Sequence, residues 1–201
     1  MFKNTNVYDC SMFNIGIKTY NSGSVFDSMF QYCKYLVKLP ELPVTTLADS
    51  CYSSMFNGCT GLTTIPNNLL PATTLTNGCY ESMFNGCTGL TTIPKLPATT
   101  LKSVCYNSMF WNCASLVETP EGWYLPAQTT ASFSCMNMFY SCSKLHKMAV
   151  SYSGTIDSTN WWDFLNFVSE TGTFYYSKNQ TEENIRPIVP SGWTLVQSTE
   201  W

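Results

Sequence analysis

The sequence predicts an α/β repeat solenoid, in which the chain coils into stacked units of short strands and short helical turns. Residues 51–78 read CYSSMFNGCTGLTTIPNNLLPATTLTNG and residues 79–104 read CYESMFNGCTGLTTIPKLPATTLKSV, so one segment occurs twice in succession. Cysteines recur with the same period, at intervals of 26, 28, 26 and 29 residues, as Cys33, Cys59, Cys87, Cys113 and Cys142. Such a period is typical of arrays in which each unit buries its apolar face against its neighbours.

The chain divides into three predicted segments. Residues 1–24 contain Cys10-Ser11-Met12-Phe13, an imperfect echo of the repeated Cys-x-x-x-Met-Phe, and are predicted to form an N-terminal cap. Residues 25–148 hold about five units of the solenoid. Residues 149–201 are predicted to form a C-terminal cap, because the period changes there and a solenoid must cover its last open layer.

Each unit is predicted to run from a short helix through a turn into a short strand and an extended return. The segment 51–59 places apolar groups at i, i+1, i+4, i+5 and i+8, which favours one or two helical turns facing a core. Asn57-Gly58 supplies left-handed turn residues that would end such a helix. Leu-Thr-Thr-Ile-Pro at 62–66 then has strand character and is closed by a proline.

The C-terminal cap is predicted to contain one helix and two strands. The helix is expected to begin at Ser158 or Thr159 and to stop at Gly172. Its apolar residues fall at i, i+3, i+4 and i+7, and they are Trp161, Phe164, Leu165 and Val168. Strands are predicted at 173–176 and 193–196, around a polar loop.

Two side-chain stacks are predicted along the core, because their residues keep a fixed phase in every unit. One stack consists of Met29, Met55, Met83, Met109 and Met138, and the other of Phe30, Phe56, Phe84, Phe110 and Phe139. The recurring cysteines are expected to be reduced and buried, since Val25 replaces a cysteine in the first unit and free Cys behaves as a small apolar group. The alternative is that some of them form disulfides. Without a Cys-x-x-Cys pair, neither a zinc site nor another cofactor is expected.

The pattern Met-Phe-x-x-Cys-x-x-Leu-x-x-Ile-Pro, seen at 55–66, resembles the leucine-rich repeat of BspA-like bacterial surface proteins. The Leu-Pro-Ala-Thr-Thr-Leu segments, with SETGTFY at 169–175 and PSGWT at 190–194, resemble the branch common in gut Bacteroidetes and their phages. Together these motifs cover about residues 25–197. The resemblance implies a right-handed, leucine-rich-repeat-like coil with a C-terminal capping subdomain, displayed on a bacterial surface or a phage particle.

Composition argues against several classes of protein. Charged residues make up 11% of the chain, against roughly 25% in ordinary soluble domains, and no basic run is available to bind a nucleic acid. No apolar run is long enough for a membrane helix, so membrane insertion is not expected. The opening MFKNTNVYDC lacks the apolar core of a signal peptide, which favours either a trimmed chain or an export route that needs no such peptide.

Catalytic chemistry is not indicated. His146 follows Cys142 by four residues, and a Cys-His pair can make a thiol nucleophile. The four equivalent cysteines have no such histidine, however, and His146 occupies a variable repeat position, so a structural cysteine is the stronger interpretation. The carboxylates are scattered rather than paired as a glycosidase requires.

The predicted function is therefore a non-enzymatic recognition or adhesion module that binds a protein or glycan on a cell surface. The alternative is a structural fibre or capsid-decoration subunit of a phage, and a homo-oligomer is left open. Repeat insertions often lie on a binding face, and the fourth unit carries an aromatic insertion. The predicted contact residues are Trp111, Glu118, Trp123, Tyr124 and His146. The competing interpretation is that Trp123 folds back onto the solenoid as packing.

Overall fold

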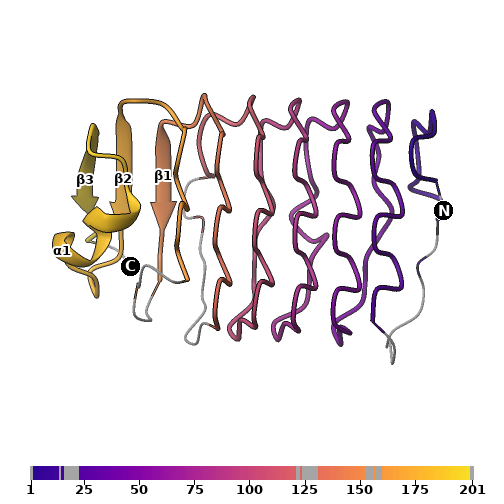
Figure 1. Cartoon of the computed structure of the whole chain (residues 1–201), viewed down its shortest axis with the longest axis horizontal. Coiled ribbons are helices and arrows are strands. Elements are labelled where there is room, and N and C mark those ends of the chain that lie inside the picture. The colour runs from indigo at the N-terminus through magenta and orange to yellow at the C-terminus, as the bar shows by residue number, and fades with distance from the viewer. Residues whose placement is uncertain are drawn as a thin grey trace.

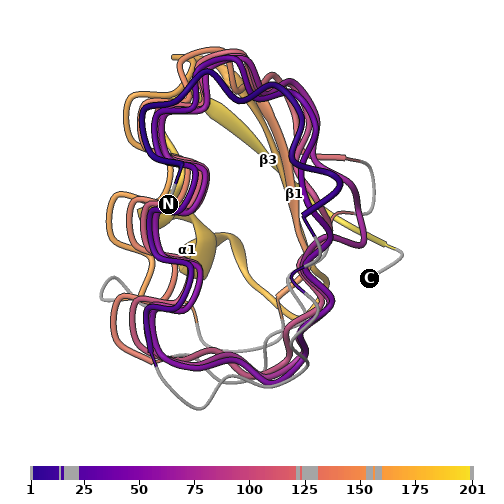
Figure 2. The ribbon, with the colours of Figure 1, turned by 90° about the vertical axis from the view of Figure 1, so that its right-hand side faces the viewer.

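In the computed structural model, the described residues are 2–13, 15, 23–120, 123, 131–152, 156 and 160–199. Successive turns of the chain lie side by side along one long axis, with the amino-terminal residues at one end and the strands at the other (Figure 1). Along that axis the turns superimpose into a ring-like outline, in which a ribbed wall faces a smoother wall that carries the strands (Figure 2). We call the ribbed wall the turn wall. Its turn rows are 24–33, 50–59, 78–87, 104–113, 133–142 and 160–168.

Hydrogen bonds within a turn row alternate between two directions. In the 78–87 row, the backbone N–H groups of Ser82 and Phe84 donate to carbonyls of the following row, Asn107 at 2.9 Å and Met109 at 3.0 Å. The N–H of Met83, between them, donates instead to the carbonyl three residues back in its own row, at 3.2 Å. Each row is therefore a chain of overlapping β-turns that is also bonded along its length to the next row.

The helix predicted for each unit is wrong, and the backbone shows why. Left-handed residues recur at every fourth position of a row, as in Gly78, Ser82 and Gly86, with φ of 59°, 52° and 71°. A right-handed helix excludes such residues. The apolar spacing of i, i+1, i+4 and i+5 follows this four-residue period of the backbone, which differs only slightly from the helical period of 3.6 residues. Gly58 is left-handed as predicted, with φ of 72°, but it is one of the left-handed residues that recur at every fourth position, and it ends no helix.

The helix predicted between Ser158 and Gly172 is wrong for the same reason. Phe139 and Ser141 donate backbone N–H groups to the carbonyls of Phe164 at 3.0 Å and Asn166 at 2.8 Å. Residues 160–168 therefore form a further turn row, and its offsets of i, i+3, i+4 and i+7 are those of the Tyr, Met, Phe and Cys positions in the rows before it. The proposed capping residues, Ser158 and Thr159, lie outside the described residues.

The smoother wall ends in a parallel sheet in the order β1-β2-β3. The strands are β1 (Lys147–Val150), β2 (Gly172–Tyr176) and β3 (Trp193–Gln197). The strands predicted at 173–176 and 193–196 are confirmed. The strand predicted at 62–66 is not formed: Thr91 donates its N–H to the Thr63 carbonyl at 2.9 Å, but Pro66 has no N–H with which to extend a ladder.

Between β2 and β3, where a polar loop was expected, two short helices follow one another. They are α1 (Glu182–Ile185) and the 3-10 helix η1 (Arg186–Ile188). Thr181 caps α1 by accepting the backbone N–H of Asn184 at 3.4 Å, which satisfies a donor that a helix start leaves unpaired. Ile185 and Ile188 are buried, so these helices add apolar cover at the carboxyl end of the stack.

Phenylalanine rings stack along the core from row to row. Their centroids are separated by 5.7 Å (Phe30–Phe56), 5.6 Å (Phe56–Phe84), 5.8 Å (Phe84–Phe110) and 5.5 Å (Phe110–Phe139). The methionines beside them are fully buried at Met55, Met83, Met109 and Met138. Met29 differs from the prediction because it is only partly buried. It lies in the first complete row, beside the short segment 2–5, whose Phe2 N–H donates to the Met29 carbonyl at 2.9 Å.

The amino-terminal segment joins this stack at a residue that was not predicted. The Phe2 ring lies 5.5 Å from the Phe30 ring and almost parallel to it, and the Phe2 carbonyl accepts the Cys33 thiol at 2.9 Å. Met12, in contrast, is 93% exposed. The Cys10–Phe13 segment is therefore not a repeat core, because Phe2 already occupies the phenylalanine place in this turn. The division into 1–24, 25–148 and 149–201 stays a prediction.

All ten cysteines are buried and free in this structure. The thiols at the row ends donate to carbonyls of the preceding row: Cys59 to Phe30 at 3.2 Å, Cys87 to Phe56 at 3.2 Å, Cys113 to Phe84 at 3.4 Å and Cys142 to Phe110 at 3.1 Å. Burial raises the pKa of Cys87 to about 12 and that of Cys51 to about 11. A cysteine thus fills a small apolar site and satisfies a carbonyl, which valine cannot do.

Candidate functional site

Trp123 does not lie on the surface. Its side chain is 2% exposed, its indole N–H donates to the Pro94 carbonyl at 3.2 Å, and its ring lies edge-on to Phe139 at 6.0 Å. The prediction of Trp123 as a contact residue is therefore wrong, because its N–H has a carbonyl partner inside and its ring packs on the core. Tyr124, the next predicted contact residue, lies outside the described residues.

Glu118 and His146 lie in neighbouring units on the smoother wall. Lys147, next to His146, pairs with Glu118 in a parallel bridge, and the two side chains form an ion pair at 3.1 Å. Both are about half exposed, so the pair contributes little to stability, roughly 0–1 kcal/mol. The His146 ring nitrogen Nδ1 lies 3.0 Å from the Lys144 carbonyl, and the Cys142 thiol bonds to the core instead. No catalytic Cys-His dyad is formed.

Trp111 lies on the turn wall, where it takes part in a different grouping. Its ring centroid is 4.4 Å from that of Tyr140, and the Tyr140 centroid is 5.0 Å from that of Phe167. We call Trp111, Tyr140 and Phe167 the aromatic ladder. Phe167, at its end, is 67% exposed, while Trp111 and Tyr140 are half-buried. The predicted contact residues are thus divided between two walls and do not form one patch.

Sequence reasoning identified Trp111 but missed its two partners. Trp111 and Tyr140 each follow the buried phenylalanine of their row, and the preceding rows have Gln31, Asn57 and Asn85 at that position. Comparing the repeats position by position would have found Tyr140. Phe167 was hidden because its segment was expected to be helical.

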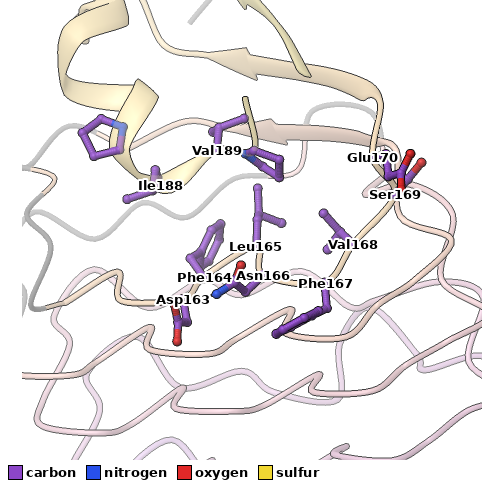
Figure 3. A pocket seen from close by; sticks show the side chains of 12 residues that line it. Asp163, Phe164, Leu165, Asn166, Phe167, Val168, Ser169, Glu170, Ile188 and Val189 are labelled. Atoms are coloured by element: carbon purple, nitrogen blue, oxygen red, sulfur yellow. Dashed lines mark hydrogen bonds between the residues drawn. The ribbon is translucent and has the colours of Figure 1, made fainter. Parts of the chain in front are cut away.

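A groove of about 230 Å³ lies beside the last turn row, between residues 163–170 and 187–190. Figure 3 shows Leu165 and Val168 on one side, with Ile188 and Val189 opposite, and Asp163 and Glu170 at its two ends. No lysine or arginine lines it, and no thiol or histidine is present. The groove can therefore accept apolar groups, with carboxylates at its two ends.

Two carboxyls among the described residues have shifted pKa values. Burial, and to a smaller extent repulsion from Asp27, raises the pKa of Glu81. Hydrogen bonds from Ser11, together with Lys38, lower the pKa of the exposed Asp9 carboxyl to about 2. Asp9 is paired with Lys38 at 3.1 Å, whereas Glu81 lies in the turn row 78–87 near Asp27, so the two shifts have separate causes.

Within the described part of the chain, no group of three or more His, Cys, Asp or Glu residues could hold a metal ion. No helix in that part is long and apolar enough to cross a membrane. No family model, no curated protein and no solved structure matches this chain. The resemblance to BspA-like repeats stays a prediction.

Proposed function

We propose that the chain is a non-enzymatic recognition or adhesion module, a leucine-rich-repeat-like solenoid displayed on a bacterial surface or a phage particle. It binds a protein or glycan partner through the turn wall. The observation that carries the proposal is the aromatic ladder of Trp111, Tyr140 and Phe167, with ring centroids 4.4 and 5.0 Å apart. Aromatic side chains held in place on a rigid scaffold are the usual anchors of binding surfaces.

The position of the ladder supports a binding role over a packing role. Asn57 and Asn85 occupy the same place in rows of nearly identical sequence, so folding of a row does not require an aromatic residue there. Aromatic side chains that stay half exposed lower solubility. An exposed apolar patch of this kind is typical of an interaction site.

The alternative function, a structural fibre or decoration subunit, is favoured by the carboxyl end of the stack. Strand β3 is the last strand of the sheet, and the apolar groove of Figure 3 lies at the same end. A second subunit that packed there would cover both features.

The double variant Trp111→Asn/Tyr140→Asn tests the proposal, because it installs the residue that the neighbouring rows carry. We expect its retention on bacterial or host cells, or on protein and glycan arrays, to fall at least tenfold, while its thermal midpoint stays within a few degrees. The matched control is Val37→Thr/Val117→Thr, which replaces two exposed valines by the threonine found at Thr63 and Thr91. Equal retention of ladder variant and control would contradict the proposal, and concentration-dependent oligomers in sedimentation would favour the structural alternative.

A further inference from the structure

A second surface, far along the chain from the ladder, contains the exposed tyrosines Tyr8, Tyr32 and Tyr35. A pocket of about 300 Å³ at the amino-terminal end is lined by Asn4, Thr5, Asn6, Tyr32, Lys34 and Tyr35. We call it the tyrosine pocket. Its two sides are fixed by backbone bonds, from the Asn4 N–H to the Gln31 carbonyl and from the Val37 N–H to the Tyr8 carbonyl, both 2.9 Å. The pocket is therefore part of the ordered stack.

Tyr32 has a backbone conformation that does not suit it. Its φ is 60°, at a row position where the next two rows have Gly58 and Gly86, with φ of 72° and 71°, and the fourth has Asn112. Glycine and asparagine tolerate this left-handed region, whereas a bulky side chain there is strained. The Tyr32 ring lies over Gly58, where an added Cβ would overlap it. A residue that breaks the local rule without entering the core points to a function.

Tyr35 and Tyr8 are also exposed aromatic residues in the unit that begins the stack. Their rings stack with centroids 5.3 Å apart and planes 24° apart, although the side chains are 49% and 60% exposed. The place of Tyr35 is taken by Gly61 and Gly89 in the next two units. The unit that begins the stack thus presents aromatic faces to solvent where its neighbours present glycines.

Polar groups with free hydrogen-bonding capacity surround these rings. The side-chain amides of Asn4 and Asn6 bond to no described residue, and Lys34 makes no ion pair with one. The Thr5 hydroxyl is already committed to the Phe2 carbonyl, so it stabilises the pocket floor. No carboxylate lines the pocket. A ligand in this pocket would therefore meet amide hydrogen-bond donors and acceptors next to aromatic faces.

We propose that the tyrosine pocket binds a saccharide. A sugar ring has an apolar face of C–H groups, which packs on the electron-rich face of a tyrosine, and a rim of hydroxyls, which exchange hydrogen bonds with amides. Two tyrosine rings and four amide, hydroxyl or ammonium side chains line the pocket, so it offers a sugar both an aromatic face and hydrogen-bonding groups. Lys34 additionally suits a sugar that carries a carboxylate. This site shares no residue with the aromatic ladder and would bind its ligand independently of it.

Isothermal titration calorimetry of the full chain with chitotriose, a neutral probe, and 3′-sialyllactose, an acidic one, tests the proposal. We expect at least one probe to bind, and the variant Tyr32→Gly/Tyr35→Gly to weaken that binding at least tenfold without lowering the thermal midpoint. Glycine is the residue that the next units carry, and it relieves the φ of Tyr32. The variant Val117→Thr, at an exposed position outside both the pocket and the ladder, is the control and should bind as the wild type does.

The variant Lys34→Gln separates the two probe chemistries, because only the binding of sialyllactose should weaken if the ammonium meets a carboxylate. The proposal is overturned if neither probe binds the wild type, or if the tyrosine variant binds as tightly as the control. Failure here is distinguishable from failure of the proposed function. If the ladder variant loses cell retention and the wild type binds no saccharide, the tyrosine pocket alone is removed. If the wild type binds a saccharide and the ladder variant keeps its cell retention, the ladder alone is removed.

Discussion

At the residue scale, the thiols at the ends of the turn rows connect sequence to stability most directly. Cys59 and Cys87 each donate to the carbonyl of the phenylalanine one row earlier, at 3.2 Å. Cys113 and Cys142 lie at the same position in later rows and likewise donate to a carbonyl of the preceding row. Reaching a disulfide would require the side chains to turn toward each other.

We predict that the thiols do not react while the chain is folded. Burial raises the pKa of Cys87 to about 12 and of Cys135 to about 12, so the reactive thiolate is scarce at neutral pH. Iodoacetamide at pH 8 should label few of the ten cysteines of the native protein and nearly all of them after unfolding in guanidinium without reductant. Mass spectrometry counts the labels, and four or more disulfide bridges in the unfolded, unreduced sample would contradict the prediction.

Phe84 lies in the middle of the ring stack and is fully buried, so the substitution Phe84→Ala should cost about 3–5 kcal/mol of unfolding free energy. Chemical denaturation measures this loss. The control is Val117→Ala at an exposed position, which should change stability by less than about 0.5 kcal/mol. A loss below about 1 kcal/mol at Phe84 would place that ring on the surface.

Repetition in the sequence made the buried phenylalanines predictable, because a residue at one phase in every unit has the same environment in every unit. Trp123 and Phe2 have no sequence counterpart in other units, whereas Met29, the one residue of the two predicted stacks that differs from the prediction, lies in the first complete row. Trp123 belongs to an insertion with no counterpart, so nothing in the sequence shows that its N–H reaches Pro94. Phe2 stands alone before any repeat is recognisable, and only the structure reveals that it ends the ring stack.

At the scale of the element, the turn row shows how a four-residue repeat of β-turns can be mistaken for a helix. Both structures bring residues at i and i+4 to the same side, so apolar spacing alone does not separate them over nine residues. The distinguishing signal is the residue between the apolar pairs. Ser54, Gly58, Ser82 and Gly86 are left-handed, and Ser and Gly are poor residues for a helix interior.

The left-handed positions predict a specific effect of adding a side chain. Gly86 has φ of 71°, and an added Cβ would meet only Gly58 backbone atoms at 3.6 Å or more, so Gly86→Ala introduces strain without a clash. We expect a loss of about 1–2 kcal/mol by chemical denaturation. The neighbouring substitution Asn85→Ala is the control and should be nearly neutral. Equal stability of the two variants would mean that position 86 is not held in the left-handed region.

At the scale of the whole molecule, each turn row donates hydrogen bonds to the next, so the rows form one continuous ladder along the axis of Figure 1. Among the described residues, no further row follows the row 160–168. The backbone N–H groups of Asp163 and Phe167, which correspond to bonded donors in earlier rows, have no hydrogen-bond partner among the described residues. Helices α1 and η1 add apolar cover at this end but do not replace the missing carbonyls.

Amide hydrogen exchange followed by NMR tests most directly whether stacked turn rows, rather than helices, build the chain. Ser82 and Phe84 donate to the next row, so their amides should exchange only on global unfolding. The amide of Phe167 should exchange fast, while that of Asn166, which donates to the Asp163 carbonyl at 3.3 Å, exchanges more slowly. A helix over 161–168 would instead bond the Phe167 N–H to the Asp163 carbonyl. Strong protection at Phe167 would therefore contradict the turn-row architecture, and fast exchange beside protected Ser82 and Phe84 is the result that it predicts.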